Sequence, residues 1–237
     1  MPSPGTLPPK QLILAPFDQD GYYWKAAQST GGKTLENVEL VTRGGRAGII
    51  NDDVAGNGPV TLRNLKIRMA AGKIEHSEWG ARLYFGDDEE QENLIEDVEV
   101  IDESPAEGPS FMDEHAFYSN YGRGNVTVRR FRASNIPAQG IQMRHTKNRA
   151  DPDWKSERTV TYEDIHLREC GQKRGAGRAG FSVSLKDSGP KSILLLKKVD
   201  IECTQQEAVY KDSSGVWRDS FGALCLEYAE HVEIEDL

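Results

Sequence analysis

Apolar and polar residues along this chain follow a short sequence motif, called the phrase below, that occurs seven times. The phrase reads apolar–x–Asn/Asp–apolar–x–apolar, and its clearest copies are Leu35–Leu40, Leu62–Ile67 and Ile95–Val100. Later copies begin at Val128, Tyr162, Leu196 and, in part, Ile234. The fourth positions fall at residues 38, 65, 98, 131, 165, 199 and 237, so the spacings are 27, 33, 33, 34, 34 and 38 residues. Self-similarity at such a period predicts a repeat architecture.

A second recurring element lies between these copies. It is a small residue, mostly glycine, followed by alternating residues, as in Gly80–Phe85, Gly140–Arg144 and Gly180–Leu185. Period-two alternation predicts a strand with one buried face. The phrase itself predicts two short strands, one on each side of its Asn/Asp, because these residues tolerate the left-handed conformation of a sharp bend.

Each repeat is therefore predicted to hold three short strands and three bends. Strands that return in the same direction stack in parallel, about 4.8 Å apart, and share one apolar core. An antiparallel sandwich would need turn signals roughly every 8–12 residues and does not explain the longer period.

The bend residues resemble the stacked asparagines at the tight turn of the pectate-lyase-like superfamily; they are Asn37, Asn64, Asp97 and Asp164. The resemblance covers residues 34–237 and implies an all-β domain, a single-stranded right-handed parallel β-helix of about six to seven rungs. Residues 1–10 are expected to form a flexible Pro-rich leader and residues 11–33 an irregular N-terminal cap. No single function is implied, because this architecture hosts lyases, hydrolases, epimerases, phage tail proteins and adhesins.

Charge and composition narrow the classes of partner. The net charge is -9 and no long run of Lys or Arg is present, so we expect neither nucleic acid nor membrane as a partner. No apolar stretch approaches the roughly 18 residues of a membrane span. No signal peptide is visible, and the expected location is extracellular or on a virion surface. Three cysteines do not predict a disulfide framework, and Cys203 and Cys225 are interpreted as small buried hydrophobes.

A binding groove is expected over the Gly-led strands, because the long insertions flank these strands and loops on a rigid scaffold often carry function. Families that this chain resembles bind polysaccharide along that face. Alternation predicts one outward patch of Arg82, Tyr84, Tyr118, Asn120, Gln142 and Arg144, whereas leucines are expected at Leu224 and Leu226 in the last turn. Aromatic rings beside planar polar groups suit sugars, and arginine suits uronate carboxylates. The other interpretation of the patch is an ordinary solvated sheet face.

Titratable residues gather at Asp113–His115 and again at Arg144–Lys147. A uronate lyase or epimerase must neutralise a carboxylate, remove the C5 proton and supply a proton elsewhere. Arg144 is the candidate for the first role, Tyr118 for the acid, and the candidate bases are His115, His145 and Lys147. Asp113 is assigned to substrate binding with Arg82, Tyr84, Asn120 and Gln142. The other interpretation is that His115 caps a loop while Asp113 and Glu114 are solvated.

Metal-dependent and carboxylate-pair chemistry fit the sequence less well. Calcium lyases and inverting hydrolases need clustered carboxylates on this sheet, whereas the acidic run Asp87–Glu90 falls in a predicted loop. No cofactor or metal is expected, and any enzyme would be a metal-independent polysaccharide lyase or epimerase. Two functions remain open: a protein that binds, and in the enzymatic case cleaves, acidic polysaccharide, or a non-catalytic tail or surface β-helix. Two explanations of the uncovered C-terminal end are left open: a second copy or a neighbouring chain covers it, or the sequence is one piece of a longer protein.

Overall fold

Among the residues that the computed structural model describes, the chain forms strands and no helix. The described residues are 7–14, 22–25, 33–42, 47–52, 59–69, 79–85, 92–103, 113–120, 125–136, 139–144, 159–171, 180–184, 193–202, 209–211, 217–219, 223–227 and 231–237. None of them belongs to a helix that could cross a membrane. The prediction of an all-β chain is confirmed.

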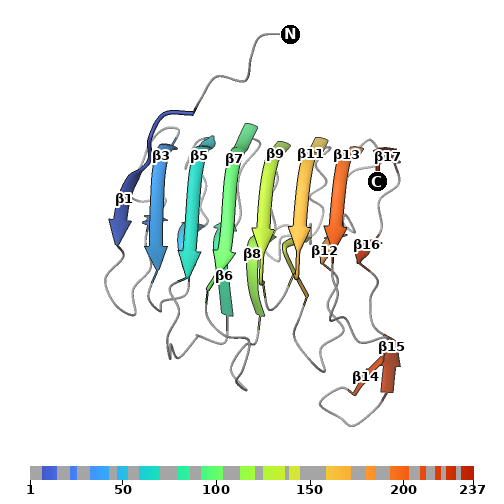
Figure 1. Cartoon of the computed structure of the whole chain (residues 1–237). Coiled ribbons are helices and arrows are strands. Elements are labelled where there is room, and N and C mark those ends of the chain that lie inside the picture. Colours follow the sequence, from blue (N-terminus) through green and yellow to red (C-terminus); the bar gives the residue numbers. More distant parts are fainter. Residues whose placement is uncertain are drawn as a thin grey trace.

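One parallel sheet of eight strands contains every copy of the repeated phrase. Its strands, in order across the sheet, are β1 (Gln11–Leu14), β3 (Lys33–Thr42), β5 (Val60–Met69), β7 (Glu92–Asp102), β9 (Asn125–Ser134), β11 (Thr159–Arg168), β13 (Ile193–Glu202) and β17 (His231–Glu235). Figure 1 shows these strands side by side in one layer, with colours that follow the chain from blue to red. Neighbours in the sheet are thus consecutive repeats of the sequence.

A second parallel sheet contains the Gly-led strands. Its strands are β2 (Tyr22–Lys25), β4 (Ala47–Asp52), β6 (Trp79–Phe85), β8 (Asp113–Asn120), β10 (Ile141–Arg144), β12 (Phe181–Ser184) and β16 (Leu224–Glu227). The chain alternates between the two sheets, an arrangement consistent with a parallel β-helix. A separate antiparallel pair consists of β14 (Val209–Lys211) and β15 (Trp217–Asp219), which lies at the lower right in Figure 1.

The predicted bend is present in every copy of the phrase. The third position has a positive φ throughout: Asn37 58°, Asn64 51°, Asp97 53°, Arg130 51°, Asp164 55°, Lys198 52° and Asp236 55°. Arg130 and Lys198 therefore adopt the left-handed conformation although long side chains rarely do so. In the six complete copies the strand continues through the bend, so each of these repeats contributes one long bent strand and one short strand where the sequence predicted three separate strands.

The core lies between the two sheets. The long strands contribute a column of residues that are 0% exposed, namely Leu62, Ile95, Val128, Tyr162 and Leu196. The short strands contribute Leu83, Phe117, Ile141 and Phe181, also 0% exposed. Tyr162 meets Phe181 edge to face, with ring centroids 4.8 Å apart, so the two layers interlock.

The N-terminal segment differs from the irregular cap expected at residues 11–33. Strand β1 pairs in parallel with β3, and β2 pairs in parallel with β4. The described part of this segment therefore extends each sheet by one strand. Its partly buried Ile13 packs against the core, while Leu12 and Leu14 are 59% and 57% exposed.

Candidate functional site

Strand register brings part of the predicted patch into one row. Leu83, Phe117, Ile141 and Phe181 are partners across β6, β8, β10 and β12, and they form the inward row. The next residues along these strands are Tyr84, Tyr118, Gln142 and Ser182, which are also partners. Two residues further on, Asn120 is the partner of Arg144 and Arg144 of Ser184. Register partners in a parallel sheet lie about 4.8 Å apart, so the two rows are adjacent on one face.

The alignment expected for β6 was wrong by two residues. The sequence interpretation placed Ala81 level with Phe117, and therefore Arg82 level with Tyr118. In the structure Ala81 is level with His115, and it is Tyr84 that is level with Tyr118. Arg82 lies two residues before Tyr84, so it occupies the same alternating set of positions but nearer the start of the strand. The sequence interpretation aligned Gly80 with Ala116 as the starts of equivalent strands, whereas in the structure Gly80 is the partner of Glu114.

The last turn was also misaligned, by one residue. Leu224, and not Ala223, is the partner of Phe181, and Leu226 is the partner of Val183. Both leucines are partly buried and pack against the core, so this turn does not present leucines on the outer face. Cys225 is instead the partner of Ser182 in the outer row and is only half-buried, which corrects its interpretation as a buried hydrophobe. Cys170 is the buried thiol among the described residues.

Two of the predicted site residues make a ring contact. The rings of His115 and Tyr118 stack, with centroids 5.1 Å apart and planes inclined by 22°. His115 is 4% exposed, whereas Tyr118 is half-buried. Gln142, the partner of Tyr118, is also only 4% exposed. Tyr118 therefore has the most exposed surface of these three residues.

The other predicted residues are placed by their backbone positions. Asp113 begins β8 and Asn120 ends it, and Arg144 ends β10. His145, Lys147 and Cys203 lie outside the described residues. The sequence led us to expect that Asp113–His115 and Arg144–Lys147 lie close together. Only the strand register bears on this expectation: Arg144 is the partner of Asn120, which lies five residues along β8 from His115.

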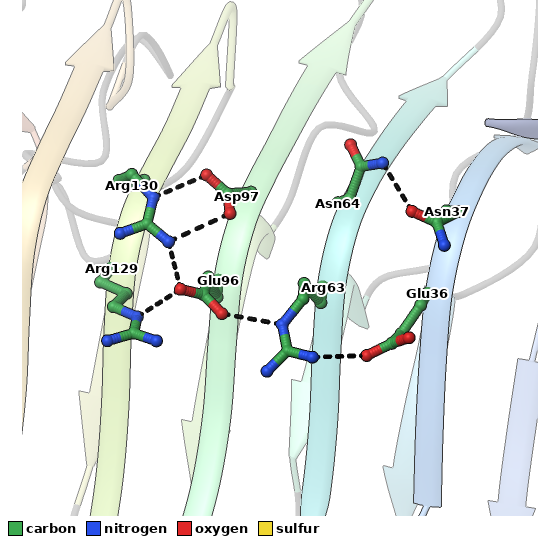
Figure 2. Close-up of polar contacts among 8 residues, drawn as sticks. All are labelled: Glu36, Asn37, Arg63, Asn64, Glu96, Asp97, Arg129 and Arg130. Carbon is green, nitrogen blue, oxygen red and sulfur yellow. Dashed lines mark hydrogen bonds and ion pairs between the residues drawn. The ribbon is translucent and has the colours of Figure 1, made fainter. Parts of the chain in front are cut away.

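The eight-stranded sheet carries a charge pattern that the sequence interpretation missed. The residue just before each bend alternates in sign from strand to strand: Glu36, Arg63, Glu96, Arg129, Glu163, Lys197 and Glu235. Each is the register partner of the next. Figure 2 shows the first four members of this charge ladder joined by ion pairs. The signal was present in the second position of the repeated phrase and becomes visible when the copies are aligned.

Glu96 is the centre of this network. Its Oε2 accepts a hydrogen bond from Arg63 Nε at 2.8 Å, and its Oε1 lies 2.6 Å from Arg129 Nε. Arg130 also donates to Glu96 and forms a second pair with Asp97, with Nε to Oδ1 at 2.7 Å (Figure 2). Burial raises the pKa of Glu96, but contacts with the three guanidinium groups outweigh burial and lower the pKa to about 2.

Further charge pairs and one amide pair join the same strands. Arg68 bridges Glu39 and Glu103, with contacts of 2.9 Å and 2.7 Å. The pKa of Arg68 is raised, chiefly by its hydrogen bonds to Glu103 and Glu39. At the bend, Asn64 Nδ2 donates to Asn37 Oδ1 at 2.7 Å, which confirms the predicted stacking for this pair. These groups satisfy one another, so the charge ladder supports the fold and is less suited to binding a ligand.

The described side chains include no group of three or more His, Cys, Asp or Glu residues arranged to hold a metal ion. The chemistry available on the seven-stranded sheet is therefore that of a tyrosine ring, planar amides and an arginine position. Comparisons with protein-family models, with curated proteins and with solved structures found no match for this chain.

Proposed function

We propose that this protein binds an acidic polysaccharide along the outer face of the seven-stranded sheet, over β6, β8 and β10. The observation that carries the proposal is the register that aligns Tyr84, Tyr118 and Gln142 in one row and Asn120 with Arg144 in the next. The scaffold we propose is a right-handed parallel β-helix of about six to seven rungs, similar to the pectate-lyase-like superfamily. The proposed location is outside the cell or on a virion surface, where such polymers occur.

The chemistry of the two rows supports a sugar ligand. Aromatic rings stack on the apolar CH face of a sugar, and an amide at the position of Asn120 would both donate to and accept from its hydroxyl groups. Gln142 is 4% exposed and is not proposed as a direct sugar contact. An arginine pairs with a carboxylate through two parallel hydrogen bonds, which favours a uronate over a neutral sugar. Because each row crosses the strands, the polymer would lie along the direction in which the repeats stack.

Burial supports binding more than catalysis. His115, one of the candidate bases, is 4% exposed, and its ring is stacked on Tyr118. A general base must come within hydrogen-bond reach of the proton that it removes. Of the proposed catalytic residues, Tyr118 and Arg144 have register positions that suit contact with a bound polymer, and these positions also suit binding alone.

Calorimetric titration with polygalacturonate, alginate and neutral dextran tests the proposal. We expect binding to the two polyuronates and much weaker binding to dextran. Arg144→Ala should weaken polyuronate binding about tenfold or more, because a charge-assisted pair is lost. The matched control is Arg132→Ala, which removes the same charge from the exposed face of the other sheet and should leave affinity within about twofold.

The proposal is overturned if wild-type protein binds none of the acidic polymers, or if the two arginine variants lose affinity equally. Catalysis is measured in the same samples by the ultraviolet absorbance of unsaturated uronate and by proton exchange at C5. Turnover that His115→Ala abolishes without unfolding the protein would make the site an enzyme active centre.

The charge ladder favours a second candidate function, that of a non-catalytic structural β-helix in a tail or surface assembly. Six successive register positions of the eight-stranded sheet pair opposite charges, and the first three of these pairs are in ion-pair contact, which favours a single alignment of the strands. Such a sheet suits a rigid spacer that works as a homo-oligomer. Light scattering at several protein concentrations tests this candidate, since a stable monomer that binds polyuronate contradicts it.

A further inference from the structure

The stacking of His115 on Tyr118 is unusual for two residues of one strand. In a regular strand, residues three apart point to opposite faces and their Cα atoms lie about 10 Å apart. Here the ring centroids are 5.1 Å apart. The strand β8 must therefore bend between these two residues.

Two backbone hydrogen bonds mark the bend. The N–H of Ala116 donates to the carbonyl of Gln139 at 3.2 Å, and the next N–H, of Phe117, donates to the carbonyl of Gly140 at 3.0 Å. Successive N–H groups of a regular strand point to opposite neighbours, so two donors to one side indicate a local irregularity like that of a β-bulge. Such irregularities re-aim side chains, often beside functional sites.

The bend is held in place by the core. Ala116 and Phe117 are both 0% exposed, so neither can leave its position without opening the packed interior. His115 lies below the surface while Tyr118 retains an exposed part. The result is a buried ring beneath a more exposed ring, at the centre of the row formed by Tyr84, Tyr118 and Gln142.

We propose that His115 is a positioning residue that fixes the ring of Tyr118 as a stacking platform for a sugar residue of the polysaccharide. This inference rests on the proposed function and specifies which side chain contacts the apolar face of the sugar. A ring held before binding loses less conformational freedom when the ligand arrives, so preorganisation increases affinity. The imidazole acts here through its ring and takes no part in proton transfer.

Four substitutions separate the role of the ring from a general structural role. His115→Leu replaces the imidazole ring with an apolar side chain of similar size that has no ring, and His115→Phe keeps a flat ring. Tyr118→Ala removes the ring on which the sugar would stack, and Tyr118→Phe keeps that ring. We expect His115→Leu to weaken polygalacturonate binding about threefold to tenfold and His115→Phe to restore it to within about twofold. Tyr118→Ala should weaken binding about tenfold or more, and Tyr118→Phe should bind within about threefold of wild type.

Near-ultraviolet circular dichroism reports on how rigidly the ring of Tyr118 is held. A substitution that only lowered stability would leave this signal of the folded protein unchanged. The tyrosine band should decrease in His115→Leu and return in His115→Phe, at unchanged unfolding midpoints. If wild type binds polygalacturonate and folded His115→Leu binds equally well, the inference is overturned while the proposed function stands. Equal losses in His115→Leu and His115→Phe also overturn it, because the ring would then not matter. If wild type binds no polyuronate, the proposed function itself fails.

Discussion

Arg130 and Asp97 occupy the same bend in neighbouring repeats, and both have a positive φ, of 51° and 53°. Arg130 Nε donates to Asp97 Oδ1 at 2.7 Å, and its Nη2 lies 3.1 Å from Asp97 Oδ2. A two-point pair of this kind fixes both direction and distance. It explains how an arginine is accommodated at a bend where Asn or Asp is preferred. The pKa of Arg130 is raised, first by its hydrogen bond to Asp97.

Removal of the Glu96 carboxylate should destabilise the protein. Glu96 is 6% exposed and contacts three arginines, so Glu96→Gln should lower the free energy of unfolding by about 2–3 kcal/mol at pH 7. Urea denaturation measures this change. The matched control is Glu99→Gln, because the side chain of Glu99 is 44% exposed and pairs with Lys66 at 3.1 Å; its loss should be below about 1 kcal/mol.

Acid should remove the contribution of Glu96. The pKa of Glu96 falls from an ordinary 4.5 to about 2 on folding, so its stabilisation is complete above about pH 4.5 and is lost as the pH falls toward 2. We expect the difference in unfolding free energy between wild type and Glu96→Gln to shrink across this window. A difference that stays constant from pH 6 to pH 2.5 would contradict the assignment.

Arg63 forms ion pairs with two carboxylates that differ in burial, so the effect of carboxylate burial on the strength of the pair can be measured at one side chain. It contacts Glu36, whose side chain is 37% exposed, at 2.7 Å, and Glu96, whose side chain is 8% exposed, at 2.8 Å. Double-mutant cycles to alanine should give a larger coupling for the pair with the buried carboxylate than for the pair with the exposed one. Equal couplings would show that burial of the carboxylate does not control the strength of these pairs.

Lys198 should be a site where substitution stabilises the protein. Its φ is 52°, its side chain is exposed, and asparagine tolerates this backbone conformation better than lysine does. We expect Lys198→Asn to raise the unfolding free energy by about 0.5–1 kcal/mol. Lys197→Asn, one residue earlier in ordinary strand conformation, is the control and should be neutral or destabilising. Thermal unfolding of both variants decides the point.

Gly140 should not tolerate a methyl group. A Cβ atom there would lie 2.9 Å from Leu167 Cδ2 and 3.0 Å from Cys170 Sγ, and both residues are buried. Gly140→Ala should cost about 1–3 kcal/mol through overpacking. Cys170→Ala in the same chain should recover part of that loss by making room, which a cycle of the single and double variants would measure. No recovery would show that the contact with Leu167, and not that with Cys170, limits the space at this position.

The bends were predictable because their cause is local. A left-handed residue is favoured by its own side chain, so Asn37, Asn64, Asp97 and Asp164 marked the corner without any knowledge of neighbours. Arg130 and Lys198 share the conformation although nothing in their own chemistry favours it. The repeat spacing placed both correctly, and for Arg130 the pair with Asp97 of the preceding repeat holds the conformation.

The alignment of the short strands was less predictable. Alternation gave the inward residues Phe117, Ile141 and Phe181 correctly, but it placed Ala81 and Ala223 where Leu83 and Leu224 lie. A period of two does not fix which residue faces which across strands, and a slip of one residue, as at Leu224, also exchanges the two faces of the strand. The contact between His115 and Tyr118 was also beyond alternation, because it depends on a bend in β8.

The sequence by itself determined the repeat, the parallel stacking, the bends and the inward column of the long strands, since each follows from local preference or from periodicity. Only the tertiary structure decided the register of the short strands, the burial of His115 and Gln142, and the convergence of three arginines on Glu96. These features depend on which residues from different repeats share one level of the stack. That choice is made when the shared core closes, because every repeat must then bury its apolar column against the next.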